Sequence, residues 1–157
     1  MTTRDNFTAS RRNFLLSLAG LLLLPVSKVC AAPTLSAKLI PLIYEVTGGE
    51  IPKTGRVKLT LPAIAESGNS VPLKVQVESP MTVDDYVKSL HLFSEKNPRP
   101  VIARFHLNPR SGKAEINTRI RLAGSQQVIA VAVMHDGSSW MGTAEVVVTA
   151  GACVEGT

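Results

Sequence analysis

RVKLTLPAIAESGNSVPLKVQVE, residues 56–78, contains two runs in which apolar and polar side chains alternate. In the first run, 56–61, every second side chain is apolar, beginning with Val57. In the second, 73–78, the apolar positions begin with Leu73. A period of two is typical of a β-strand that buries one face. This stretch therefore predicts two strands of a sheet with one face in the core.

The chain beyond residue 86 continues this pattern. The segments EKNPRP, NPRSG, AGSQ and HDGSS are rich in Pro, Gly, Asn and Ser and separate further apolar runs, and the Asp-Gly pair favours a tight hairpin. The strands expected from these runs are 87–94, 101–107, 114–122, 126–135 and 140–149. We therefore predict an all-β, immunoglobulin-like antiparallel β-sandwich of about seven strands. The Cys-Trp-Cys pattern of antibody domains is absent, so the likeness is one of architecture only.

The segment before the first strand, residues 33–50, has a different period. Its apolar side chains recur at helical spacing at Leu35, Leu39, Leu42 and Ile43. Pro41 lies within this pattern, and Gly48 and Gly49 follow it. We expect a short helix or turn that packs on the sandwich and ends at these glycines.

Residues 1–32 are typical of an export signal. Arg11 and Arg12 precede an apolar run at 14–26, which as a helix would span about 20 Å, less than a bilayer core of about 30 Å. The paired arginines indicate a twin-arginine signal rather than a plain secretory leader. Small residues in VCAAP allow cleavage near Ala31 or Ala32, and a lipid anchor on Cys30 is the alternative. We expect a periplasmic protein with a domain at 33–149, an arm at 150–157 and no membrane anchor after cleavage.

Once this leader is set aside, the net charge excludes few classes of function. The whole chain carries a formal charge of +5, but the leader holds four basic residues and one acidic residue, so +2 remains. The basic character is mostly that of the leader, and it gives no reason to expect nucleic-acid or membrane binding.

The cysteines point to the tail. Removal of Cys30 with the leader leaves Cys153 as the only thiol, and an odd cysteine in an exported protein indicates an intermolecular bond or a reactive thiol. If the domain ends at Thr149, an extended chain at about 3.3–3.6 Å per residue carries Cys153 some 13–14 Å outward. Gly151 and Ala152 keep this arm thin. The pattern favours a swinging arm that carries a bound group, or else a disulfide tether to a partner.

Other groups of reactive side chains are less informative. His91, His106 and His135, with Met134 and Met141, lie on different predicted strands or turns without metal-ligand spacing, so we expect no metal site. Residues 84–85, an Asp pair, fit a polar turn better than a catalytic carboxylate pair. Nucleophile, phosphate-loop and cofactor motifs are absent from the sequence. We expect neither catalytic residues nor a cofactor.

The chain resembles the SoxY family, the sulfur carriers of the periplasmic thiosulfate-oxidising (Sox) system, over about residues 40–153. The most specific pieces are GNSVPLKVQVESPMT, SEKNPRP, TRIRLAGSQQVIAVAVMHDGS and the tail cysteine. The resemblance implies that Cys153 holds sulfur intermediates covalently while separate enzymes load, oxidise and hydrolyse them. It also implies a heterodimer with a SoxZ-like β-sandwich subunit.

The tail departs from the usual SoxY arm, Gly-Gly-Cys-Gly-Gly. Here the matching residues are Gly151, Ala152, Cys153, Val154 and Glu155. Ala152 and Val154 reduce backbone freedom, and Glu155 adds a negative charge near a site for anionic cargo. The arm is more similar to a SoxY-related subgroup with Ala-Ala-Cys-Ile-Glu. Two other functions stay open: an interaction module whose cysteine tethers a partner or senses redox state, and a metal-binding sandwich.

Overall fold

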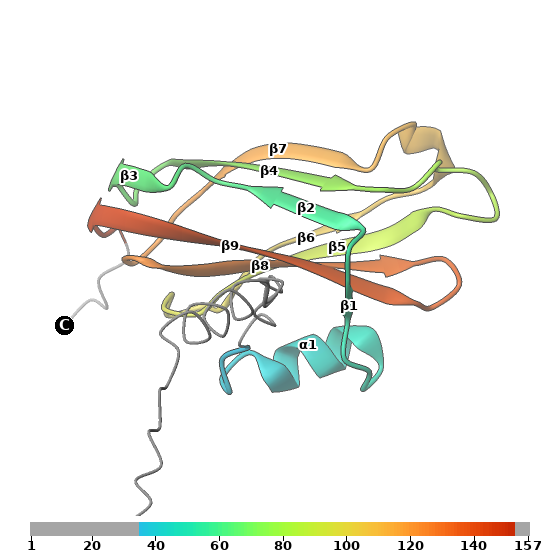
Figure 1. Cartoon of the computed structure of the whole chain (residues 1–157), viewed down its shortest axis with the longest axis horizontal. Coiled ribbons are helices and arrows are strands. Elements are labelled where there is room, and N and C mark those ends of the chain that lie inside the picture. Colours follow the sequence, from blue (N-terminus) through green and yellow to red (C-terminus); the bar gives the residue numbers. More distant parts are fainter. Residues whose placement is uncertain (1–34, 153–157) are drawn as a thin grey trace, which may run out of the picture. The chain divides into compact units, whose positions relative to one another are not determined.

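The computed structural model describes residues 35–152 of the chain, which belong to one compact unit, 33–157. They form two β-sheets that face each other, with a helix against the outer face of the larger sheet (Figure 1). The elements in chain order are α1 (Ile40–Thr47), β1 (Lys53–Thr54), β2 (Val57–Thr60), β3 (Ile64–Ser67), β4 (Val71–Val77), β5 (Val87–Ser94), β6 (Val101–His106), the 3₁₀ helix η1 (Pro109–Ser111), β7 (Glu115–Ile120), β8 (Gln126–Met134) and β9 (Ser139–Ala150). The predicted all-β sandwich is confirmed.

The larger sheet has the order β1-β9-β8-β5-β6, and β3 also pairs with β9. The smaller sheet has the order β2-β4-β7. The two alternating runs that predict strands, 56–61 and 73–78, become β2 and β4, which pair antiparallel with Val57 opposite Val77. Alternate side chains of β4 are buried, as the period of two requires.

Two short strands, β1 and β3, were not predicted. Both pair with β9 in parallel, Lys53 with Trp140 and Ile64 with Val147, so the sandwich is not purely antiparallel. β1 has two residues and β3 has four, of which Ala65 alone is buried. Such short, exposed segments carry no alternating pattern, and the long strand β9 supplies the pairing that forms them.

Apolar side chains gather on both faces of the larger sheet. One cluster fills the space between the sheets and includes Val75, Leu90 and Ala130. The other lies under α1 and joins Leu39 and Ile43 to Phe93, Ile129, Val131 and Met141. Because β5 and β8 are covered on both faces, their side chains are buried almost throughout rather than at every second position.

The predicted helix is confirmed over 40–47. Pro41 lies in its first turn, where the missing N–H breaks no helical hydrogen bond. Gly48 ends the helix in the left-handed conformation, with φ of 73°. Within residues 35–152, no helix is long and apolar enough to cross a membrane.

Candidate functional site

The candidate site is the end of β9, where the carboxyl-terminal arm begins. Cys153, Val154 and Glu155, the thiol and the flanking residues after it, lie outside the described residues. The preceding flanking residues, Gly151 and Ala152, are described. The structure therefore shows the base from which the predicted carrier cysteine extends.

Backbone hydrogen bonds hold this base between two turns. The Gly68 amide, after β3, donates to the Ala150 carbonyl at 2.7 Å, and the Leu122 amide, after β7, donates to the Gly68 carbonyl at 2.9 Å. The Ala152 amide then donates to the Leu122 carbonyl at 2.9 Å. The chain is thus paired up to the residue before the cysteine.

Two glycines allow the strands and turns to approach this closely. A Cβ atom on Gly68 would lie 2.1 Å from the Leu122 carbonyl oxygen, and one on Gly151 would lie 2.0 Å from that of Ala123. Both distances are too short for any side chain, so glycine is required by packing. The sequence predicts that Gly151 is a thin link in the arm. In the structure, Gly151 is packed against the backbone of Ala123 and is part of the base.

The reach of the arm is shorter than the sequence predicts. β9 continues to Ala150 rather than ending at Thr149, and Ala152 is itself hydrogen-bonded. One residue step, about 3.5 Å, separates this last fixed residue from Cys153. The predicted reach of about 13–14 Å from Thr149 does not apply, because the first part of that length is held against the sandwich.

A buried asparagine from the β5–β6 turn supports the same base. The Asn97 Oδ1 accepts from the Ala123 amide at 2.9 Å and from the Gln126 Nε2 at 3.1 Å, and its Nδ2 donates to the Arg121 carbonyl at 2.9 Å. Asn97 and Gln126 are each 7% exposed. The sequence does not reveal this role of Asn97. The segment SEKNPRP, which contains Asn97, indicates only a turn and a part of the family resemblance.

The two methionines considered with the histidines lie in different apolar clusters. Met134 belongs to the core between the sheets and Met141 to the core under α1. His135 is stacked on Tyr86 at 4.6 Å between ring centroids. Among residues 35–152 no group of three or more His, Cys, Asp or Glu side chains could hold a metal ion.

His91 is buried beside the edge strand β6. Its Nε2 lies 3.0 Å from the Ser89 Oγ, while its Nδ1 is buried without a partner. Burial lowers the pKa of His91, and the positive charges of Arg104 and His106 lower it further. His91 is therefore a neutral, packed side chain near pH 7.

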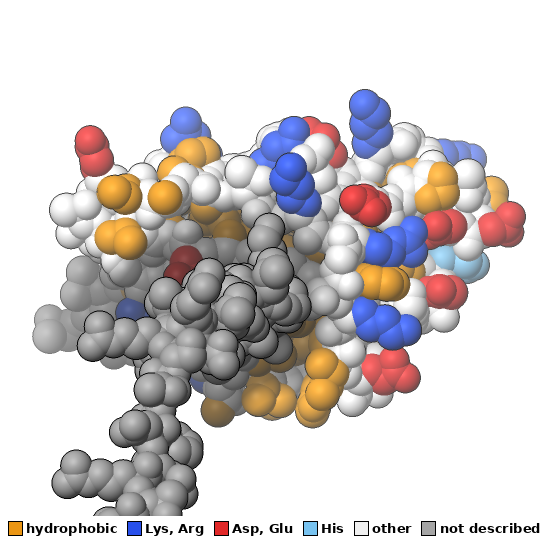
Figure 2. Space-filling model, viewed as in Figure 1, with side chains coloured by type: hydrophobic (Ala, Val, Ile, Leu, Met, Phe, Trp, Pro, Cys, Tyr) orange, Lys and Arg blue, Asp and Glu red, His pale blue; other side chains and the backbone are white. Residues whose placement is uncertain are grey.

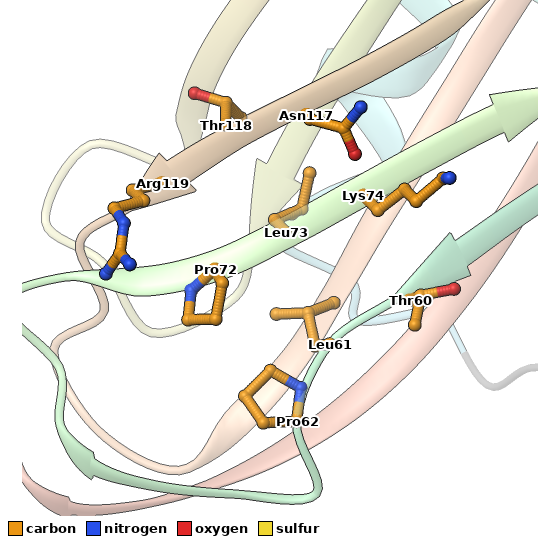
Figure 3. A pocket seen from close by; sticks show the side chains of 9 residues that line it. All are labelled: Thr60, Leu61, Pro62, Pro72, Leu73, Lys74, Asn117, Thr118 and Arg119. Carbon is orange, nitrogen blue, oxygen red and sulfur yellow. The ribbon is translucent and has the colours of Figure 1, made fainter.

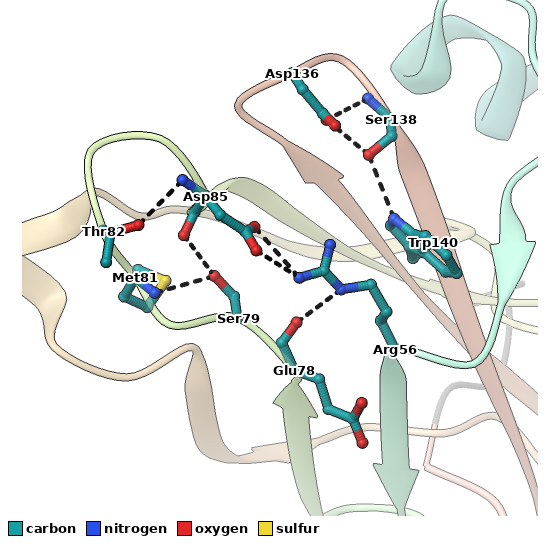
Figure 4. Close-up of polar contacts among 9 residues, drawn as sticks. All are labelled: Arg56, Glu78, Ser79, Met81, Thr82, Asp85, Asp136, Ser138 and Trp140. Atoms are coloured by element: carbon teal, nitrogen blue, oxygen red, sulfur yellow. Dashed lines mark hydrogen bonds and ion pairs between the residues drawn. The ribbon is translucent and has the colours of Figure 1, made fainter.

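One carboxylate of the Asp84–Asp85 pair has a structural partner. The Asp85 carboxylate accepts from the Arg56 guanidinium at 2.9 Å and 3.3 Å, and Arg56 also donates to the Glu78 carbonyl at 2.8 Å (Figure 4). The guanidinium carbon lies 5.6 Å from the centre of the Trp140 ring. This network ties the β4–β5 loop to β9, and it gives Asp85 a structural contact.

A groove of about 610 Å³ lies on the smaller sheet. Leu61, Pro62 and Pro72 form its apolar part, and Lys74 and Arg119 stand beside it (Figure 3). Figure 2 shows Lys and Arg side chains along the margin of the molecule where this sheet lies. The lining contains Lys74 and Arg119 and, among the described residues, no Asp, Glu, His or Cys.

A comparison with models of known protein families identifies the family of this chain. The family model described as "Sulfur oxidation protein SoxY" matches residues 43–153. The chain belongs to the SoxY family. The matched region includes the paired strands, the anchored base and Cys153 itself.

A solved SoxY structure agrees with this membership. The structure of the sulfur carrier protein SoxY from Chlorobium limicola f thiosulfatophilum is 26% identical, with a TM-score of 0.60, and the match covers 70% of this chain and 90% of that one. No curated protein sequence matches the chain.

Two superoxide reductases share the fold alone. The enzyme from Ignicoccus hospitalis is 16% identical, with a TM-score of 0.54 over 60% of this chain and 80% of that one. The enzyme from Nanoarchaeum equitans is 14% identical, with a TM-score of 0.51 over 61% of this chain and 100% of that one. These matches indicate that the SoxY sandwich is an architecture used by proteins of different function.

Proposed function

We propose that the protein is a covalent sulfur carrier, with Cys153 as the attachment residue and no catalytic activity of its own. The observation that carries the proposal is that the SoxY family match extends to Cys153, directly after a residue that is hydrogen-bonded to the sandwich. The proposal requires that the active site of another protein reaches this thiol.

The loading step requires an electron acceptor. When the Cys153 thiol joins the terminal sulfur of thiosulfate, an S–S bond forms, the thiol proton is released and two electrons leave. The thiolate is the reacting form. We propose that a separate oxidising enzyme accepts these electrons. Other enzymes then oxidise or hydrolyse the bound sulfur.

We also propose periplasmic location, export by the twin-arginine route and pairing with a SoxZ-like β-sandwich subunit. Arg11 and Arg12 before a short apolar run support the export route, and family membership supports the partner. A folded heterodimer would suit a route that carries folded cargo.

The residues that flank Cys153 influence which sulfur compound the arm can carry. Val154 and Glu155 stand where the usual SoxY arm has glycine, and a carboxylate repels thiosulfate, although weakly in water. We propose that this arm belongs to the variant subgroup with Ala-Ala-Cys-Ile-Glu. The residues around the thiol then bear on which enzymes accept the arm.

Intact-protein mass spectrometry of the exported protein tests the carrier function. Cells oxidising a reduced sulfur compound are expected to yield adducts that disappear on treatment with a thiol reductant and in Cys153→Ser. A bare thiol under these conditions would contradict the proposal. A stoichiometric disulfide to one protein on a non-reducing gel would instead support the tether.

A further inference from the structure

We propose that Asn97 is a positioning residue that fixes the point from which the cysteine arm leaves the sandwich. This inference rests on the proposed carrier function and adds a determinant of how the thiol is presented. The observation behind it is a series of hydrogen bonds that connects Asn97, in the β5–β6 turn, to Ala152 through residues 121–123.

The Asn97 side chain holds both flanks of the turn that receives the arm. Its Nδ2 donates to the Arg121 carbonyl and its Oδ1 accepts from the Ala123 amide, each at 2.9 Å. Between these two residues lies Leu122, whose carbonyl accepts from the Ala152 amide at 2.9 Å. The acceptor that anchors the arm thus lies between two residues that the Asn97 side chain holds.

A second buried amide fixes the orientation of Asn97. The Gln126 Nε2 donates to the Asn97 Oδ1 at 3.1 Å, and the Gln126 Oε1 accepts from the Lys96 amide at 2.8 Å. Buried polar groups are costly unless they are paired, and a fully paired network holds one arrangement. The arrangement specified here is that of the turn at 121–123.

The chain contains a matched residue, Asn108, at the other end of the antiparallel β5–β6 pair. Asn108 caps η1, and its Oδ1 accepts from the Arg110 amide at 2.9 Å. Each asparagine therefore holds a turn through a backbone amide. Loss of Asn108 should destabilise the fold without changing the arm, whereas loss of Asn97 should release the arm base.

The consequence for the carrier is a fixed exit point. The amide of Ala152, one residue before the cysteine, is held to the sandwich by the Leu122 carbonyl. An enzyme that reacts with Cys153 must then approach the turns that contain Gly68, Asn97 and Leu122. Release of the Leu122 carbonyl would move the exit point back toward Ala150.

Hydrogen exchange and a nitroxide probe test this inference in the full-length chain carrying Cys30→Ser, so that Cys153 is the only thiol. In Asn97→Ala we expect the Ala152 amide to exchange about tenfold faster, which corresponds to loss of one hydrogen bond. The amides of β8 should keep their rates. A nitroxide on Cys153 should tumble faster in Asn97→Ala than in Asn108→Ala, whose spectrum should equal that of the parent chain.

An unchanged Ala152 exchange rate in Asn97→Ala, or an equal increase in Asn108→Ala, would overturn the proposal. If Asn97→Ala does not fold, Gln126→Ala removes the support of Asn97, and the same increase at Ala152 is expected there. Neither measurement depends on the cargo. Failure of the carrier function would appear separately, as a thiol without adducts in the unsubstituted protein.

Discussion

The Ala152 amide donates to the Leu122 carbonyl at 2.9 Å, which joins the end of β9 to the β7–β8 turn. The residue before the cysteine therefore belongs to the fold, and the turn at Leu122 fixes the point from which the chain continues to Cys153.

The first prediction concerns the close approach at the arm base. Gly68→Ala would place a Cβ 2.1 Å from the Leu122 carbonyl oxygen and 3.0 Å from the Ala152 nitrogen. We expect the free energy of unfolding to fall by about 1–3 kcal/mol, because overpacking forces the backbone to shift. Urea denaturation measures this change.

Gly124→Ala is the control for this substitution. No atom lies within 4 Å of a Cβ built on Gly124, so its free energy of unfolding should change by less than about 0.5 kcal/mol. Equal losses in both variants would show that the contact between the turn and the arm base does not constrain residue 68.

The main strands could be predicted from their own residues, either by alternation, as in β4, or by an apolar run bounded by turn residues, as in β8. Val71 to Val77 alternates in burial as its sequence requires. Neither β1 nor β3 has such a pattern, since each forms through pairing with β9. A segment stabilised by a distant strand leaves little trace in its own residues.

The site was predictable only in part for the same reason. Cys153 draws attention as the single thiol of the expected mature chain. Its base depends on contacts between distant segments: Asn97 with Ala123, and Leu122 with Ala152. No local pattern brings these residues together, and the topology of β5, β7 and β9 determines that they meet.

The second prediction concerns Arg56, which joins the β4–β5 loop to the sheets. Arg56→Gln removes the ion pair with Asp85 and the guanidinium over Trp140. We expect a loss of about 1–2 kcal/mol in the free energy of unfolding. The ion pair is half-exposed and contributes only part of this loss, and the hydrogen bond from Arg56 to the Glu78 carbonyl contributes another part. Fluorescence of the single tryptophan follows the transition.

Lys58→Gln is the matched control, because Lys58 lies on β2 and is exposed. It should leave the unfolding midpoint nearly unchanged. A similar shift in both variants would indicate a general effect of charge rather than the Arg56 network.

The third prediction concerns Glu115 on β7. Hydrogen bonds from Lys74, Asn117 and Gln76 lower the pKa of Glu115 from 4.5 to about 2. Lys74 makes the shortest of these contacts, at 2.9 Å, so Lys74→Met should return the pKa toward 4.5. NMR titration of the side-chain carboxyl carbon measures this shift, and a midpoint that stays near 2 would contradict the assigned cause.

The fourth prediction is a pH dependence of stability that arises from His91. Burial, followed by the charges of Arg104 and His106, lowers its pKa in the folded protein below the ordinary 6.5. The unfolded chain therefore binds the proton more readily than the folded one, and the free energy of unfolding should decrease as the pH falls below about 6.5. Above that pH the contribution of His91 is constant, since the residue is neutral in both states.

The loss of unfolding free energy between pH 7.5 and 5.5 should be smaller in His91→Gln than in the parent chain. Replacement of the exposed His135 by Gln should leave this loss unchanged. Urea titrations at the two pH values compare the variants, and an identical decrease in all three proteins would assign the dependence to other groups.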